Sequence, residues 1–241
     1  MTPFRIGSRS RVRPAKMIVA IPARNEANDI AKCLRSVAIA AGQCDVHVEV
    51  VVAADSCCDD TIDVARSTPM NGVGVSIIEG GWASAGSARA NAVARGLSGS
   101  GIPSQRVWIA NTDADCQVPD DWCRRQIDLA ERCDAVSGIV DLDPEHTDPS
   151  VYEAFLGSYR LEVDSHQHVH GANFGVRADA YVAAGGWAIG VRVGEDHLLW
   201  NSLHAAGYKL RQDPALAVRT SARTRSRVIG GFATGLALLE R

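Results

Sequence analysis

Short apolar runs alternate with segments of helical period over the first 140 residues of this chain. The apolar runs predict strands, and the periodic segments predict helices. The predicted strands are 17–21, 46–54, 73–78, 106–110 and 135–140. The predicted helices between them are 28–41, 59–66, 84–97 and 119–132. Such alternation is typical of an α/β fold, in which a mostly parallel central sheet carries helices on both faces. Ligands of such sheets bind beyond the carboxyl ends of the strands, so the residues that follow each strand are candidates for a site.

The remainder of the chain has a less regular pattern, with neither an internal repeat nor a long linker. Helices are expected around 150–163, 178–184 and 195–206, with a turn at Gly171–Asn173 and a strand near 215–220. We expect a flexible basic leader at 1–16 and one domain over 17–241. The nucleotide-binding half of that domain is 17–145, and the acceptor-side half with the C-terminal tail is 146–241.

Composition excludes several functional classes. A formal net charge of -3 gives no electrostatic basis for binding nucleic acid, so we expect no nucleic acid partner. The seven cysteines lack the spacing of a zinc site and are interpreted as reduced thiols. No run approaches the roughly 20 apolar residues of a membrane-spanning helix. We expect a cytoplasmic protein. The tail segment 219–239 is Arg-rich and then apolar, and it could make peripheral contact with a membrane instead of being a solvated basic face.

Two carboxylates one residue apart, Asp113 and Asp115, directly follow the predicted strand 106–110. Two like charges at the end of a buried strand are costly unless a cation lies between them and their partner. Mg²⁺ and Mn²⁺ are often shared between one or two carboxylates and the phosphates of a substrate. The pair therefore predicts a divalent metal that holds a diphosphate. The alternative is that both residues only end the strand and cap the next helix.

Six segments, in chain order, resemble motifs of the family 2 glycosyltransferases, which have the GT-A fold. They are Ile21–Glu26, Val51–Thr61, Gly86–Asn91, Asp113–Asp115, Gly171–Arg177 with Gly185–Trp187, and Gly194–Trp200 followed by Ala206–Tyr208. The resemblance covers residues 17 to 210. It implies metal-dependent, inverting transfer of a sugar from a nucleotide-diphosphate sugar, with a UDP-sugar preferred, to an acceptor hydroxyl. The sequence departs from the family pattern where Ala54 replaces the first of two acids and where Cys57 and Cys58 replace small hydroxyl residues.

The resemblance also assigns roles to individual residues. Asp115 would contact the metal, Asp113 would share it or bind the ribose, and Asp55 would accept a hydrogen bond from the base. Arg89, in the first turns of a helix, would contact the diphosphate. The full nucleotide-binding set is Pro22, Arg24, Asn25, Glu26, Asp55, Arg89 and Asp113. Each has a plainer alternative: a surface ion pair for Arg24 and Glu26, backbone capping for Asp55, and a solvated helix arginine for Arg89.

On the acceptor side the resemblance assigns Gly171, Ala172 and Asn173, and it assigns the general base to Asp196, with Glu195 second. Acids in a first helical turn also stabilise the helix dipole, so their position alone does not require catalysis. Asp196 lies three residues before Leu199 on the apolar stripe, and we expect it to point toward the cleft. Removal of the acceptor proton by such a base would invert the anomeric configuration.

His166, His168 and His170 alternate, so on an extended segment their side chains would lie on one side. Such a row could be a transition-metal site or a polar wall near the acceptor.

A different function, a non-catalytic sugar-nucleotide-binding protein on a GT-A fold, is the alternative to an enzyme. Both acidic pairs, at 113–115 and 195–196, argue against it. The chain also has no G-x-G-x-x-G turn after Ile21, which argues against a dinucleotide-dependent oxidoreductase.

Overall fold

The structure is a computed structural model that describes residues 11–143, 147–158, 166 and 168–220. Most of the predicted leader, the end of the helix expected to reach residue 163, and the tail 221–241 lie outside the described residues. The expectations for those segments remain predictions. Within the described part of the chain, no helix combines the length and apolar character needed to cross a membrane.

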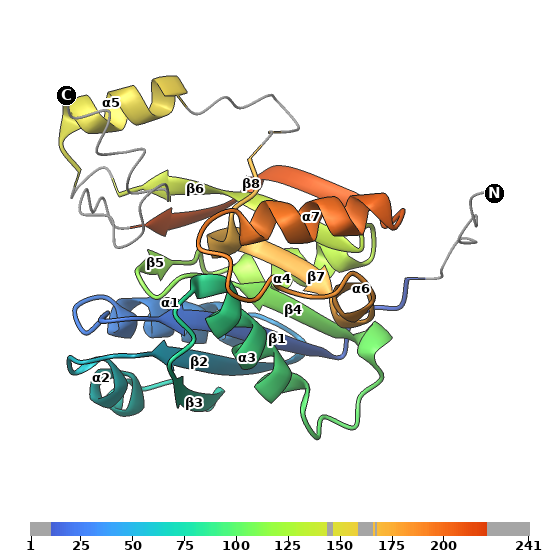
Figure 1. The fold of residues 1–241 in the computed structure, drawn as a ribbon, viewed down its shortest axis with the longest axis horizontal. Helices are drawn as coiled ribbons and strands as arrows, with labels where there is room; N and C mark the ends of the chain where they lie inside the picture. The colour runs from blue at the N-terminus through green and yellow to red at the C-terminus, as the bar shows by residue number, and fades with distance from the viewer. Residues whose placement is uncertain (1–10, 144–146, 159–165, 167, 221–241) are drawn as a thin grey trace.

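A central sheet organises the described residues (Figure 1). Its strand order is β3-β2-β1-β4-β7-β6-β8-β5. Strands β1, β2, β3 and β4 are mutually parallel, whereas β7 is antiparallel to both β4 and β6. The strands are β1 Lys16–Ala23, β2 His47–Asp55, β3 Gly74–Gly80, β4 Val107–Asn111, β5 Cys116–Gln117, β6 Ala135–Leu142, β7 Phe174–Arg177 and β8 Leu210–Thr220.

Helices cover both faces of the sheet, as the sequence predicts. One core layer packs α1 and α4 against the sheet, and the other packs α3, α6 and α7 against the opposite face. The helices are α1 Ile30–Gly42, α2 Thr61–Ser67, α3 Ala85–Leu97, α4 Trp122–Ala130, α5 Pro149–Ser158, α6 Ala178–Ala183 and α7 Glu195–Ala205. Successive residues of β1 enter alternate layers: Met17 and Val19 enter the first, and Ile18 and Ala20 the second. A strand buried on both faces is apolar throughout, which is why β1 is readable as a continuous run.

Two short strands were not predicted. Strand β7 occupies the gap between β4 and β6, and its residue Gly175 lies against the side chains of Trp108 and Gln126, where a Cβ would collide. Strand β5 has only two residues and pairs with the end of β8. Neither segment carries an apolar run, because both strands exist through pairing with neighbours that come from distant parts of the sequence. The strand predicted near 215–220 is also longer, and begins at Leu210.

Candidate active site

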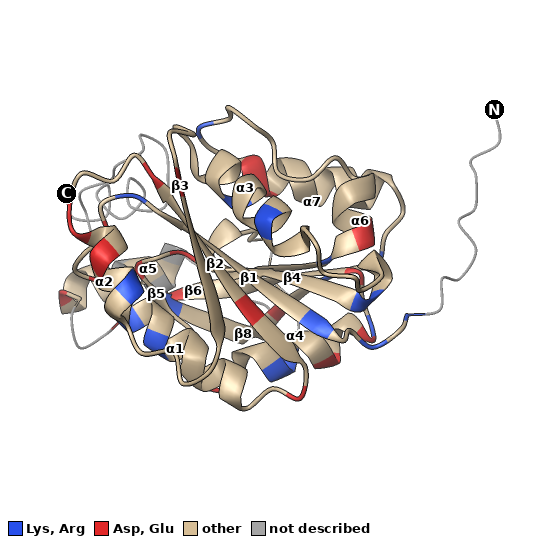
Figure 2. Ribbon diagram, turned by 90° about the horizontal axis from the view of Figure 1, so that it is seen from below, with Lys and Arg blue, Asp and Glu red and all other residues tan. Residues whose placement is uncertain are grey.

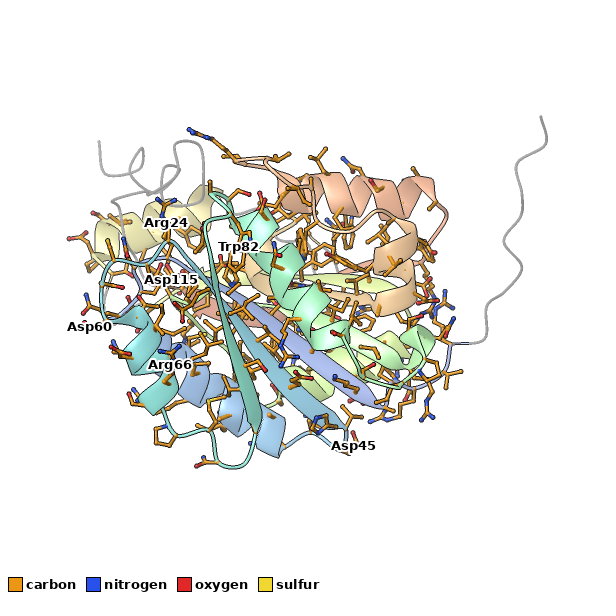
Figure 3. The ribbon with its side chains drawn as sticks, turned by 60° about the horizontal axis from the view of Figure 1, so that its bottom comes forward. Arg24, Asp45, Asp60, Arg66, Trp82 and Asp115 are labelled. Carbon is orange, nitrogen blue, oxygen red and sulfur yellow. The ribbon has the colours of Figure 1, made fainter. Side chains whose placement is uncertain are left out.

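The carboxyl ends of the parallel strands meet at one end of the sheet. Figure 3 shows Arg24, Trp82 and Asp115 at this end and Asp45 at the opposite one. Arg24 follows β1, and Asp115 follows β4. Pro22 lies within β1 and is half-buried beside Ala53 of β2. The residues predicted from the strand ends are therefore brought to one edge, as the parallel topology requires.

The loops after β1 and β2 are tied to each other. Asn25 has a left-handed backbone with φ of 54°, and its side-chain Oδ1 accepts a hydrogen bond from the Cys58 backbone N–H at 2.8 Å. The backbone N–H of Glu26 donates to Thr61 Oγ1 at 2.6 Å. The Cys57 thiol donates to the carbonyl of Ala23 at 3.4 Å. The two cysteines that depart from the family pattern therefore take part in the link between these loops.

Asp55 is buried at the end of β2 and organises the loop between β3 and α3. Its Oδ1 accepts hydrogen bonds from the backbone N–H groups of Trp82 at 2.7 Å and Ala83 at 3.2 Å. These partners lie 27 and 28 positions away, so Asp55 holds a distant loop rather than capping its own backbone. Ala83 has φ of 59°, a left-handed conformation that these bonds hold in place. A hydrogen bond from Asp55 to a nucleotide base, as predicted, would have to use the other carboxylate oxygen.

Arg89 of α3 is buried and joins the two predicted acidic motifs. Its Nη1 donates to Glu195 Oε1 at 2.7 Å, and its Nη2 donates to Asp113 Oδ1 at 2.5 Å. Its guanidinium lies 5.3 Å from the ring centroid of Trp187. Burial works to lower the pKa of Arg89, but the charges of Asp113 and Glu195 outweigh it and raise the pKa above its ordinary value. The cation therefore stays charged.

The buried position of Arg89 contradicts the alternative of a solvated helix arginine, whereas its predicted contact with a diphosphate stays a prediction. The physical reason is that Glu195 lies 106 positions away, so no local pattern connects it with Arg89. A buried guanidinium needs carboxylate partners, and its planar donors suit two of them. Trp187 also belongs to this cluster. The sequence placed it in a family motif, Gly185–Trp187, but assigned it no individual role.

Asp196 lies in the first turn of α7, beside the loop that precedes β7. Its Oδ2 accepts a hydrogen bond from the Gly171 backbone N–H at 3.0 Å, and its Oδ1 accepts one from the His197 N–H at 2.8 Å. Gly171 has no room for a side chain, because a Cβ would lie 2.7 Å from the Arg89 guanidinium. Asp196 is half-buried, whereas Glu195 is buried and bonded to Arg89. The two adjacent acids therefore have different environments.

The other residues predicted on the acceptor side belong to the packed interior. Asn173 is fully buried, and its amide donates to the carbonyls of Ile139 at 2.9 Å and Leu216 at 2.8 Å. Its oxygen accepts from the Trp122 ring N–H at 3.0 Å. Asn173 thus fills an irregularity between β6 and β8, where the register shifts, and both of its amide N–H groups are engaged inside the fold. Ala172 packs against the α1–α4 core layer. Of the three, Gly171 is the residue that contacts Asp196.

The three histidines lie in a row, as their alternation predicts. The ring centroids of His166 and His168 are 6.0 Å apart, and those of His168 and His170 are 5.7 Å apart, with the rings stacked. Burial lowers the pKa of His166, and it lowers that of His170 to about 4. The neighbouring histidines of the row also lower the pKa of His166 and His170, because a charged ring would repel another. The described residues include no group of three or more His, Cys, Asp or Glu side chains placed to hold a metal ion, so this row is not assigned to a metal.

Asp115 faces a cavity of 1410 Å³ bounded by α1, β5 and the ends of β6 and β8. The cavity lining includes four basic residues, Lys32, Arg35, Arg125 and Arg219, and six aspartates, whereas Asp196 lies outside it. Asp113 keeps about a third of its side chain exposed while it binds Arg89. A hard divalent cation needs only one or two protein carboxylates when substrate phosphates complete its coordination. The donor set of Asp115 and Asp113 fits such an ion, and the aspartates of the lining favour a cation that accompanies any anionic ligand in the cavity.

Comparisons with known proteins agree with this geometry. The profile of glycosyl transferase family 2 matches residues 18–181. The chain belongs to this family. None of the curated proteins matches it.

Solved structures of similar fold are glycosyltransferases. TarS 1-349 of S. aureus, in complex with UDP-GlcNAc, is 14% identical with a TM-score of 0.67 over 90% of this chain and 61% of its own. The mannosyltransferase PcManGT from Pyrobaculum calidifontis, in complex with GDP-Man and Mn²⁺, is 20% identical with a TM-score of 0.64 over 89% and 59%. GalNAc-T7, with UDP, GalNAc and Mn²⁺, is 13% identical with a TM-score of 0.61 over 86% and 44%. These likenesses establish the GT-A fold. The chain spans less than two thirds of the length of each of these proteins.

Proposed function

We propose that this protein is a metal-dependent, inverting glycosyltransferase. It would move a sugar from a nucleotide-diphosphate sugar, preferably a UDP-sugar, to an acceptor hydroxyl. The observation that carries the proposal is the Arg89 bridge, which joins Asp113 of the donor side to Glu195 of the acceptor side at 2.5 and 2.7 Å. The bridge ties one side chain from each of the two acidic motifs expected in such an enzyme to the same guanidinium, which supports a single site built from both motifs.

The two acids of α7 divide their roles according to environment. Glu195 is bonded to a buried guanidinium, which holds its side chain in one orientation. Asp196 accepts only backbone hydrogen bonds in the described contacts and is half-buried, so it can face an acceptor. We therefore assign the general base to Asp196 and a positioning role to Glu195. This choice rests on the partners of the two side chains rather than on their order in the sequence.

In the proposed reaction the acceptor oxygen attacks the anomeric carbon of the donor sugar. The bond from that carbon to the diphosphate oxygen breaks, and its electron pair leaves with the nucleoside diphosphate. The acceptor proton goes to the Asp196 carboxylate, and attack from the opposite side inverts the anomeric configuration. A divalent cation held by Asp115 and Asp113 would supply electrostatic stabilisation of the departing diphosphate. Lys32, Arg35, Arg125 and Arg219 contribute positive charge to the cavity that Asp115 lines, and the six aspartates of the same lining would attract the cation.

Calorimetric titration with UDP and with GDP, each with and without Mn²⁺, tests the donor site. We expect one nucleotide to bind in a metal-dependent manner. Asp115→Ala is expected to weaken that binding by about 100-fold or more, because loss of a metal ligand removes several kcal/mol of charge stabilisation. Asp120→Ala is the matched control, since Asp120 is an exposed carboxylate that lines the same cavity. If neither nucleotide binds under any metal condition, the proposed metal–diphosphate site is wrong.

A further inference from the structure

Exposed apolar side chains gather on the segment that leads into α7. Ile189 is 78% exposed, Val193 45% and Leu198 47%. These are three of the six large hydrophobic residues that are exposed in the described part of the chain, and they fall within ten positions. Single exposed apolar residues are ordinary, whereas a group of them marks an interaction site. We call Ile189, Arg192 and Val193, together with His197 and Leu198 of the first turns of α7, the pre-α7 surface.

The backbone of this segment is anchored to α3. The N–H of Gly190 donates to Ser87 Oγ at 3.0 Å. Gly86 of α3 packs so closely that a Cβ would lie 2.9 Å from Glu195 and 3.0 Å from the carbonyl of Ala188. Gly190 and Gly194 have φ of 76° and 85°, left-handed conformations that favour glycine. The aliphatic side chains are therefore exposed on an anchored backbone that leads directly into the turn containing Asp196.

The exposed charge of the pre-α7 surface is basic. Residues 188–194 include Arg192 and no acid, and His197 is also exposed. The acids that follow turn inward, where Glu195 binds Arg89 and Asp196 binds the Gly171 N–H. Figure 2 accordingly shows blue (Lys and Arg) and no red (Asp and Glu) on the ribbon that leads into α7. The surface therefore combines aliphatic side chains with positive charge and is complementary to an apolar phase bordered by anions.

A bilayer with anionic headgroups is such an apolar phase bordered by anions. Aliphatic side chains enter the boundary between headgroups and acyl chains, and a guanidinium next to them pairs with lipid phosphates. We propose that the protein docks on an anionic membrane through the pre-α7 surface. Docking would place the first turn of α7, with Asp196, at the level of the headgroups. The proposal differs from contact through the tail 219–239, and vesicle binding does not depend on transfer activity.

Co-sedimentation of the full chain with vesicles tests this surface. One set of vesicles contains phosphatidylcholine alone, and the other contains phosphatidylcholine and phosphatidylglycerol in equal parts. We expect binding to the anionic vesicles that weakens as salt increases. The double variant Ile189→Ser/Val193→Ser is expected to lose about 30-fold in binding, since neither hydroxyl side chain gains from entering the apolar boundary.

The chain offers a control of the same composition. Ile39→Ser/Val182→Ser removes the same two side chains from α1 and α6, where they are 46% and 62% exposed, and is expected to bind vesicles as the unaltered protein does. An unfolding temperature equal to that of the unaltered protein establishes for each variant that it is folded. The proposal is overturned if the anionic vesicles are not bound, or if Ile189→Ser/Val193→Ser binds normally. It is also overturned if only replacement of Arg223, Arg225 and Arg227 by glutamine abolishes binding, because the tail is then the contact.

Discussion

Asp196→Asn is expected to lower the turnover number for sugar transfer by about 10²- to 10⁴-fold, the usual contribution of a general base. The amide cannot take the acceptor proton, whereas its size is nearly unchanged. Nucleotide affinity is expected to stay within a few-fold, because Asp196 does not line the cavity that Asp115 faces. Steady-state kinetics with a radiolabelled donor, combined with the calorimetric titration, separates the two effects.

Glu195→Gln decides between the two acids of α7. If Asp196 is the base, this variant keeps a proton acceptor and loses part of its activity through a displaced Arg89. If it instead abolishes turnover while Asp196→Asn remains active, the assignment of the base is reversed. Normal turnover in both variants would exclude either acid as the base. Absence of turnover in the unaltered protein with every donor, despite nucleotide binding, would favour the non-catalytic sugar-nucleotide-binding alternative.

Arg89→Met is expected to destabilise the fold by about 3–5 kcal/mol, the usual effect of removing one partner from a buried charge cluster. Methionine fills much of the volume but leaves the carboxylates of Asp113 and Glu195 without their common cation. Urea unfolding followed by circular dichroism measures the loss. Arg95→Met, at an exposed position of the same helix, is the control and is expected to change the free energy of unfolding by less than about 0.5 kcal/mol.

Arg89→Lys separates charge from geometry. Lysine restores one positive charge but cannot present the planar pair of donors that reaches two carboxylates. We expect it to recover part of the stability and to leave turnover low with little change in nucleotide affinity. Full recovery of turnover by lysine would show that the guanidinium geometry does not position the site. A stability loss no larger in Arg89→Met than in Arg95→Met would contradict the bridging role altogether.

The fold was predictable where local pattern and tertiary environment agree. Strand β1 and helices α1 and α3 follow from their apolar periods because one face or both faces of each are buried. The strand ends were predictable for the same reason, and with them the shared location of Arg24, Asp55 and Asp115. Strands β5 and β7 were not, because two- and four-residue strands carry no period of their own. They form only where neighbouring strands leave hydrogen-bonding groups to pair.

The sequence by itself determined the alternation that sets the parallel sheet, the edge that carries the candidate site and the order of the family motifs. The tertiary structure alone decided which of the candidate side chains are engaged inside the fold. Arg89 became a buried bridge because Glu195, distant in the chain, supplies a second carboxylate. Asn173 became a core residue because β6 and β8 leave carbonyl groups that need donors. Buried charges and buried polar groups must find partners, and those partners are set by packing between elements that sequence patterns describe one at a time.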